Sequence, residues 1–94
     1  MVIGVCTIEL YLSDNHSLKG KRQIVKSLKE KLQHRFNVSV AEVDHLDVWQ
    51  RATLGVCMVS NEQAHVNREL DKVIDFIETS NFAPFFLDYS MEFL

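Results

Sequence analysis

The densest group of residues that could do chemistry lies within residues 42–51. It comprises Glu42, Asp44, His45, Asp47 and Trp49. Carboxylates beside an imidazole can bind a metal ion, or a carboxylate can orient His45 as a general base. Their spacing matches no established metal motif, and no nucleophile accompanies them. We therefore expect no catalytic residue, no metal and no cofactor here. The carboxylates are expected to pair with Arg22, Arg51 or a partner's bases, while Trp49 docks on apolar surface.

The largest charge feature is a basic segment, because seven of the ten lysines and arginines fall between positions 19 and 35. On one face of a helix, such residues can neutralise RNA phosphates and give salt-sensitive binding. The alternative is the solvated face of an ordinary small protein. Bases near a helix N-terminus oppose the helix dipole, and a bound phosphate would explain their position. The candidate nucleic-acid-binding residues are Lys19, Lys21, Arg22, Lys26 and Lys29, with Lys31 and Arg35 beyond them.

Hydropathy patterns predict four strands and two helices that would position these residues. Strands are expected over residues 2–12, 36–43, 52–60 and 85–94. Ser17 is expected to cap a helix that ends near His34. Ser60 or Asn61 is expected to cap a second helix that ends near Thr79, because Ser60 and Gln63 fit a capping box.

This order predicts an α+β fold, namely a ferredoxin-like βαββαβ two-layer sandwich. Its four-stranded antiparallel sheet would carry both helices on one face, with strands one and three in the centre. Ninety-four residues are expected to form a single domain, 1–94.

Composition narrows the classes of protein. No apolar run approaches the roughly 18–20 residues that span a bilayer, so no membrane contact is expected. Cys6 and Cys57 lie in apolar runs without metal-ligand spacing, which indicates buried free thiols in the cytoplasm. The net charge is −3, yet residues 1–41 hold seven bases and three acids, and residues 42–94 hold three bases and ten acids. The chain is therefore basic at one end and acidic at the other.

The sheet face without helices offers a second candidate surface. It is too apolar to remain fully wet, and we expect it to bury against a second copy or a partner protein. The alternative is that sheet twist and the connection around Trp49 cover it. Base stacking as in RNA-recognition motifs is not expected, because strand three has no aromatic residue and strand one has only Tyr11. The candidate interface residues are Ile3, Val5, Tyr11, Trp49, Cys57 and Val59.

Two segments carry a specific resemblance. One is residues 15–22, Asn-His-Ser-Leu-Lys-Gly-Lys-Arg; the other is residues 36–45, Phe-Asn-Val-Ser-Val-Ala-Glu-Val-Asp-His, with 49–56, Trp-Gln-Arg-Ala-Thr-Leu-Gly-Val. The chain resembles the YlxP-like family of small bacterial proteins, which has no established activity. The resemblance implies a ferredoxin-like fold. Genes of that family often lie near those of translation initiation and ribosome maturation factors, which implies a role beside the ribosome but assigns none to any residue.

Three functions follow as hypotheses. The first is a non-enzymatic module that binds RNA or a ribosomal particle through the basic helix. The second is a homodimeric interaction protein without nucleic acid. The third is a small-ligand regulatory domain, for which the sequence holds no fingerprint.

Overall fold

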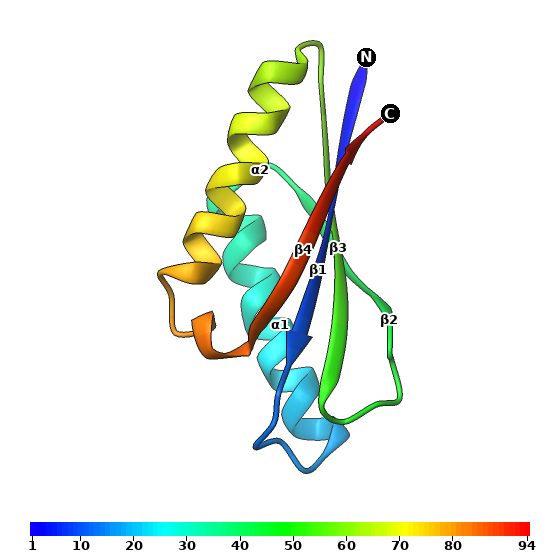
Figure 1. Cartoon of the computed structure of the whole chain (residues 1–94), viewed down its shortest axis with the longest axis vertical. Coiled ribbons are helices and arrows are strands. Elements are labelled where there is room, and N and C mark those ends of the chain that lie inside the picture. Colours follow the sequence, from blue (N-terminus) through cyan, green and yellow to red (C-terminus); the bar gives the residue numbers. More distant parts are fainter.

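A computed structural model describes all residues, 1–94, in the predicted order of elements. The strands are β1 (Val2–Tyr11), β2 (Ser39–Asp44), β3 (Arg51–Ser60) and β4 (Phe86–Phe93). The helices are α1 (Leu18–Arg35) and α2 (Gln63–Glu78), and a short 3-10 helix, Ala83–Phe85, precedes β4. All strand pairs are antiparallel, in the order β2-β3-β1-β4. Both helices cover one face of the sheet (Figure 1), which confirms the ferredoxin-like α+β sandwich.

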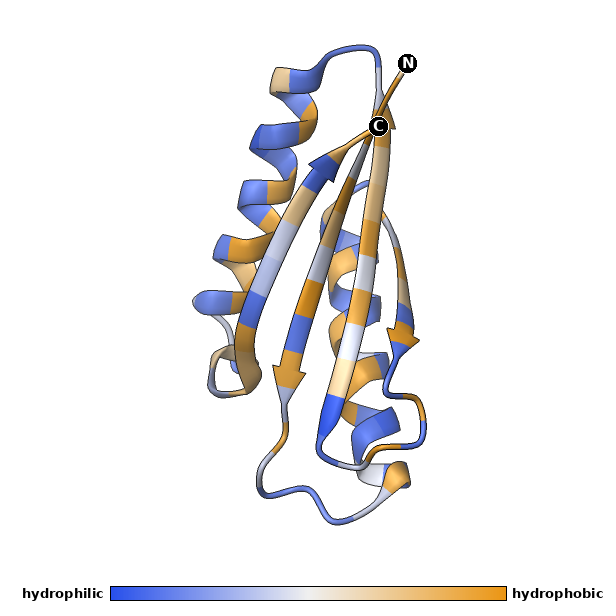
Figure 2. Ribbon diagram, turned by 45° about the vertical axis from the view of Figure 1, so that its right-hand side comes forward, coloured by the Kyte–Doolittle hydropathy of each residue, from blue (hydrophilic) through white to orange (hydrophobic).

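Alternation along the central strands produces the core. From Gly4 to Leu10, every second residue of β1 points to the helices and is buried, and from Ala52 to Met58 β3 does the same. Figure 2 shows this alternation as changes of colour along each strand. Eighteen buried apolar residues form one cluster between sheet and helices. Neither helix combines the length and apolar composition that crossing a membrane requires.

Local chemistry fixes the start of α1 as predicted. The Ser17 hydroxyl accepts a hydrogen bond from the Gly20 amide at 2.9 Å, which satisfies one amide of the first turn. The predicted cap of α2 is wrong. Glu62 holds the cap position without a side-chain bond, and the Ser60 hydroxyl accepts from the Glu62 amide at 3.3 Å. The capping box with Gln63 therefore does not form.

Two strand predictions need correction. The second strand begins at Ser39 rather than residue 36, because Phe36 ends α1 and its amide donates to the Leu32 carbonyl at 2.8 Å. In β4 the register shifts opposite Glu9 and Leu10. Because of this shift Leu87 does not share the helix-facing parity of Met91 and Phe93, and it is 54% exposed.

Candidate nucleic-acid interface

Four cations on α1 form one stripe, which we call the basic stripe: Lys19, Arg22, Lys26 and Lys29. Their spacing of three, four and three residues places them on one side of a helix. At 1.5 Å per residue the stripe is about 15 Å long. The side chains of Lys19, Arg22 and Lys26 are exposed, and that of Lys29 is half-buried. The only ion pair in the stripe joins Lys26 Nζ to Glu30 at 4.0 Å, and both partners are solvated.

Lys21 is not part of this surface, so its prediction as a phosphate-binding residue is wrong. Its side chain is buried, and its three N–H groups have three backbone acceptors. These are the carbonyls of His45 at 2.7 Å, Leu46 at 3.1 Å and Arg51 at 3.2 Å. Glu42 Oε2 lies 2.8 Å from Nζ and has no hydrogen-bond partner of its own, so charge attraction holds it there.

The sequence contained a signal for this ion pair. Lys21 continues the buried stripe of α1 towards its N-terminus, in the spacing 21, 25, 28 and 32 that Val25, Leu28 and Leu32 complete. Glu42 likewise has the inward parity of Val40 on β2. A charge at a core position requires a partner. The prediction that Glu42 pairs with Arg22 or Arg51 is therefore wrong. Glu42 pairs with Lys21, a lysine in the buried stripe of α1.

Lys21 joins α1 to the connection between β2 and β3, residues 45–50, which we call the Trp49 loop. Other polar contacts hold the same loop. The Asn15 side-chain amide donates to the Trp49 carbonyl at 2.6 Å and to the Ser17 carbonyl at 2.7 Å. The Gln50 carbonyl accepts from the Leu12 amide at 2.8 Å. The loop and the first turn of α1 thus lie at the same end of the molecule (Figure 1).

The imidazole of His45 takes part in a polar network on the open face of the sheet. His45 Nδ1 lies 2.9 Å from Thr53 Oγ1, and the Thr53 hydroxyl donates to Glu9 at 2.8 Å. Arg51 completes the network through Glu9 at 3.3 Å. The backbone of His45 has a positive φ of 59°, and Asp44 accepts from its amide at 2.7 Å. No group of three His, Cys, Asp or Glu residues has a placement that could hold a metal ion.

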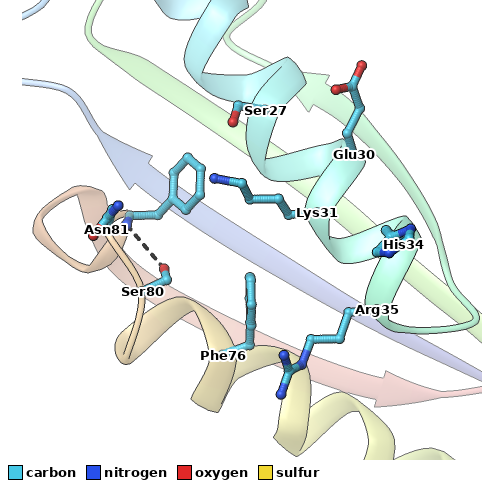
Figure 3. A pocket seen from close by; sticks show the side chains of 9 residues that line it. Ser27, Glu30, Lys31, His34, Arg35, Phe76, Ser80 and Asn81 are labelled. Carbon is cyan, nitrogen blue, oxygen red and sulfur yellow. Dashed lines mark hydrogen bonds between the residues drawn. The ribbon is translucent and has the colours of Figure 1, made fainter.

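A cleft of about 970 Å³ lies between α1, the C-terminal end of α2 and residues 80–82, which follow α2 (Figure 3). Two further bases line it, and each covers an aromatic ring of the protein itself. Lys31 Nζ lies 5.1 Å from the centre of the Phe82 ring, and the Arg35 guanidinium lies 5.3 Å from that of Phe76. These cation–π contacts give Lys31 and Arg35 a structural role that the basic stripe lacks.

The predicted interface residues form two groups, which lie at opposite ends of the sheet. Ile3 opposes Val59 and Val5 opposes Cys57 on the neighbouring strands β1 and β3, so these four lie together. Beside them is a shallow apolar groove of about 340 Å³. Tyr11 and Trp49 lie at the other end. Eight residues of strand separate Tyr11 from Ile3, a distance of about 27 Å, and the charged network around Glu9 lies between the two groups.

Comparison with known proteins places this arrangement in a family. The family model described as "Protein of unknown function (DUF503)" matches residues 3–86, which include the basic stripe and the Trp49 loop. The chain belongs to this family. It is also 36% identical over 78 residues to the "Uncharacterized protein YlxP" of Bacillus subtilis (strain 168). That alignment covers 83% of this chain and 85% of the relative, and it confirms the resemblance found in the sequence.

In this family member, some bases outside the basic stripe are ion-paired, whereas three of the four in the stripe are not. On α2, Lys72 lies 2.9 Å from Glu69, and its hydrogen bond lowers the pKa of that carboxyl. Arg51 is paired with Glu9, as described above. Lys19, Arg22 and Lys29 have no ion-pair partner in the chain. Their charge is therefore available to an external anion.

Proposed function

We propose that this protein is a non-enzymatic binding module that contacts RNA, free or within a ribosomal particle, through the basic stripe of α1. One observation carries the proposal: Lys19, Arg22 and Lys29 are unpaired, and with Lys26 they form a regularly spaced stripe about 15 Å long. Adjacent phosphates of an RNA strand present charges at comparable spacing. The second half of the chain is acidic, so a polyanion would be oriented towards α1.

The number of cations predicts the salt dependence of binding. Four phosphate contacts to a single strand give a slope of log affinity against log salt of about −3. Reversing Arg22 and Lys26 removes two of those contacts. The slope should then become shallower by about 1.4, and affinity at low salt should fall at least about tenfold.

The test compares Arg22→Glu/Lys26→Glu with a matched control, Arg68→Glu/Lys72→Glu on α2. Both double variants change the net charge by the same amount, and all four side chains are exposed. Fluorescence anisotropy of a labelled single-stranded RNA, measured between about 50 and 200 mM salt, gives affinity and slope. Circular dichroism verifies folding. Equal loss in both variants would show a response to net charge alone and would refute a site on α1, as would equal retention.

A second candidate function is self-association through the open sheet face. The observation that favours it is the apolar pairing of Ile3 with Val59 and of Val5 with Cys57, with Val59 58% exposed. Val59→Lys should abolish a dimer, whereas Val48→Lys, at the far end of the molecule, should not. Sedimentation over a wide concentration range is the measurement. A wild-type protein that remains monomeric throughout would eliminate this function.

A further inference from the structure

The exposed aromatic residues of the protein are unevenly distributed. Tyr11, Trp49 and Tyr89 are the aromatic side chains that are strongly exposed, at 46%, 52% and 43%. Two of the three, Tyr11 and Trp49, lie at the end of the molecule where α1 begins. Tyr11 is the last residue of β1 and opposes Arg51, the first residue of β3. The backbone bond from Leu12 to Gln50 then joins the residues that directly follow the two aromatics.

The Trp49 loop is built to hold a defined position. The buried ammonium of Lys21 donates to the carbonyls of His45 and Leu46 in this loop and to that of Arg51, the residue that follows it. The Trp49 carbonyl itself accepts from Asn15, and the Gln50 side chain donates to the Ser13 carbonyl at 3.2 Å. The backbone that carries Trp49 is therefore held at several points. The residue is 52% exposed, so part of its ring is accessible to a ligand.

Trp49 and the first cation of the basic stripe are connected through Asn15. Asn15, which holds the Trp49 carbonyl, also holds the Ser17 carbonyl at the start of α1. Lys19, the first cation of the stripe, follows two residues later. Two exposed acids, Asp14 and Asp47, flank the same end and disfavour a phosphate there. An aromatic surface at the end of a cationic track is the arrangement that binds single-stranded nucleic acid, with bases on the rings and phosphates on the cations.

We propose that Trp49, with Tyr11 beside it, stacks an unpaired base of an RNA strand whose phosphates follow the basic stripe. The substrate class is therefore single-stranded RNA rather than a duplex, whose bases are already stacked. This inference rests on the proposed function, because the stripe must bind the phosphates. It differs from recognition by the open sheet face, which carries no aromatic residue in its centre.

Trp49 is the only tryptophan, so its emission reports on this contact without a label. The probe is a single-stranded RNA of about ten nucleotides, compared with the same sequence as a duplex. The single strand should quench the emission of Trp49, and the duplex should not. Trp49→Ala should lower affinity for the single strand by at least about fivefold, and Trp49→Phe, which keeps a stacking ring, should restore most of it. Leu46→Ala is the matched control, because Leu46 is 55% exposed on the same loop but cannot stack.

The outcomes separate this inference from the proposed function. If Arg22→Glu/Lys26→Glu loses affinity, Trp49→Ala binds like wild type and the single strand does not quench the wild-type emission, stacking is wrong and the phosphate site stands. Equal losses in Leu46→Ala and Trp49→Ala would indicate a general apolar contact and would overturn stacking. Full RNA affinity of Trp49→Ala together with lost association to purified ribosomal subunits would assign the loop to a protein surface instead. If no RNA binds the wild type, both proposals fail.

Discussion

The buried ion pair between Lys21 and Glu42 provides a quantitative test of how the Trp49 loop is held. The perturbation is Lys21→Met, which keeps an apolar stem of similar length in the core stripe of α1. It removes three hydrogen bonds to backbone carbonyls and the one charge that faces Glu42 Oε2 at 2.8 Å. The side chains are only 1% and 15% exposed, so water does not readily replace the ammonium.

The expected loss of unfolding free energy is about 3–5 kcal/mol, because removal of one partner leaves an uncompensated charge in the protein. The three carbonyls add less, since the loop can relax until water reaches them. A protein of this length has a total stability of roughly 5–14 kcal/mol. Lys21→Met should therefore remain folded but lose a large share of its stability. Removing the second charge as well, in Lys21→Met/Glu42→Met, should recover most of the loss, because an apolar pair of similar volume is often as stable as a buried ion pair.

Urea unfolding followed by far-ultraviolet circular dichroism measures these differences. The control is Lys26→Met on the same helix, whose partner Glu30 is solvated and 4.0 Å away. That variant should differ from wild type by at most about 0.5 kcal/mol. A Lys21→Met stability within the same margin, or a double variant less stable than the single one, would refute the reasoning that charge burial dominates at this site.

Two further predictions concern the core. Gly4→Ala should lose about 1–3 kcal/mol in urea unfolding, because the added methyl overlaps α2, 2.9 Å from Leu70 Cδ1 and closer still to the preceding turn of that helix; Gly55→Ala on the open face should lose far less. Burial raises the pKa of the Cys6 thiol from 9.0 to about 11. Between those pH values the folded state keeps a proton that the unfolded state loses, so unfolding free energy should fall as pH rises, by at most about 1.4 kcal/mol per pH unit. Cys6→Ala should lack this component, and at pH 8 a thiol reagent should modify Cys57 but not Cys6 in the native protein.

Much of the fold follows from short-range patterns. The alternation in residues 2–12 predicts the inward residues of β1, and Ser17 predicts the start of α1, because both signals depend on a few neighbouring residues. The predicted capping box at Ser60 is wrong because short-range signals of this kind do not determine the path of the chain. Two residue types at the correct spacing are necessary for that motif, but the path of the chain after β3 places the cap at Glu62.

The candidate site was less predictable because its parts come from distant segments. Charge alone assigned Lys21 to the surface, although its spacing with Val25 and Leu28 indicates the core. Only the packing of β2 against α1 shows that Glu42 supplies its counter-charge. The grouping of Tyr11 with Trp49 likewise depends on the antiparallel register of β1 and β3, which brings residues 38 positions apart in sequence to one end of the sheet.

The burial of Lys21 and the exposure of Trp49 have one explanation if Lys21 serves to fix the position of the Trp49 loop rather than to stabilise the fold. An apolar pair at positions 21 and 42 could fill the same space, but it would leave the carbonyls of the Trp49 loop without donors. The double variant Lys21→Met/Glu42→Met should then be nearly as stable as wild type yet bind single-stranded RNA more weakly, because Trp49 is no longer fixed beside the basic stripe. Its affinity should approach that of Trp49→Ala in the same anisotropy titration. Wild-type affinity in a stable double variant would mean that the ion pair serves folding alone.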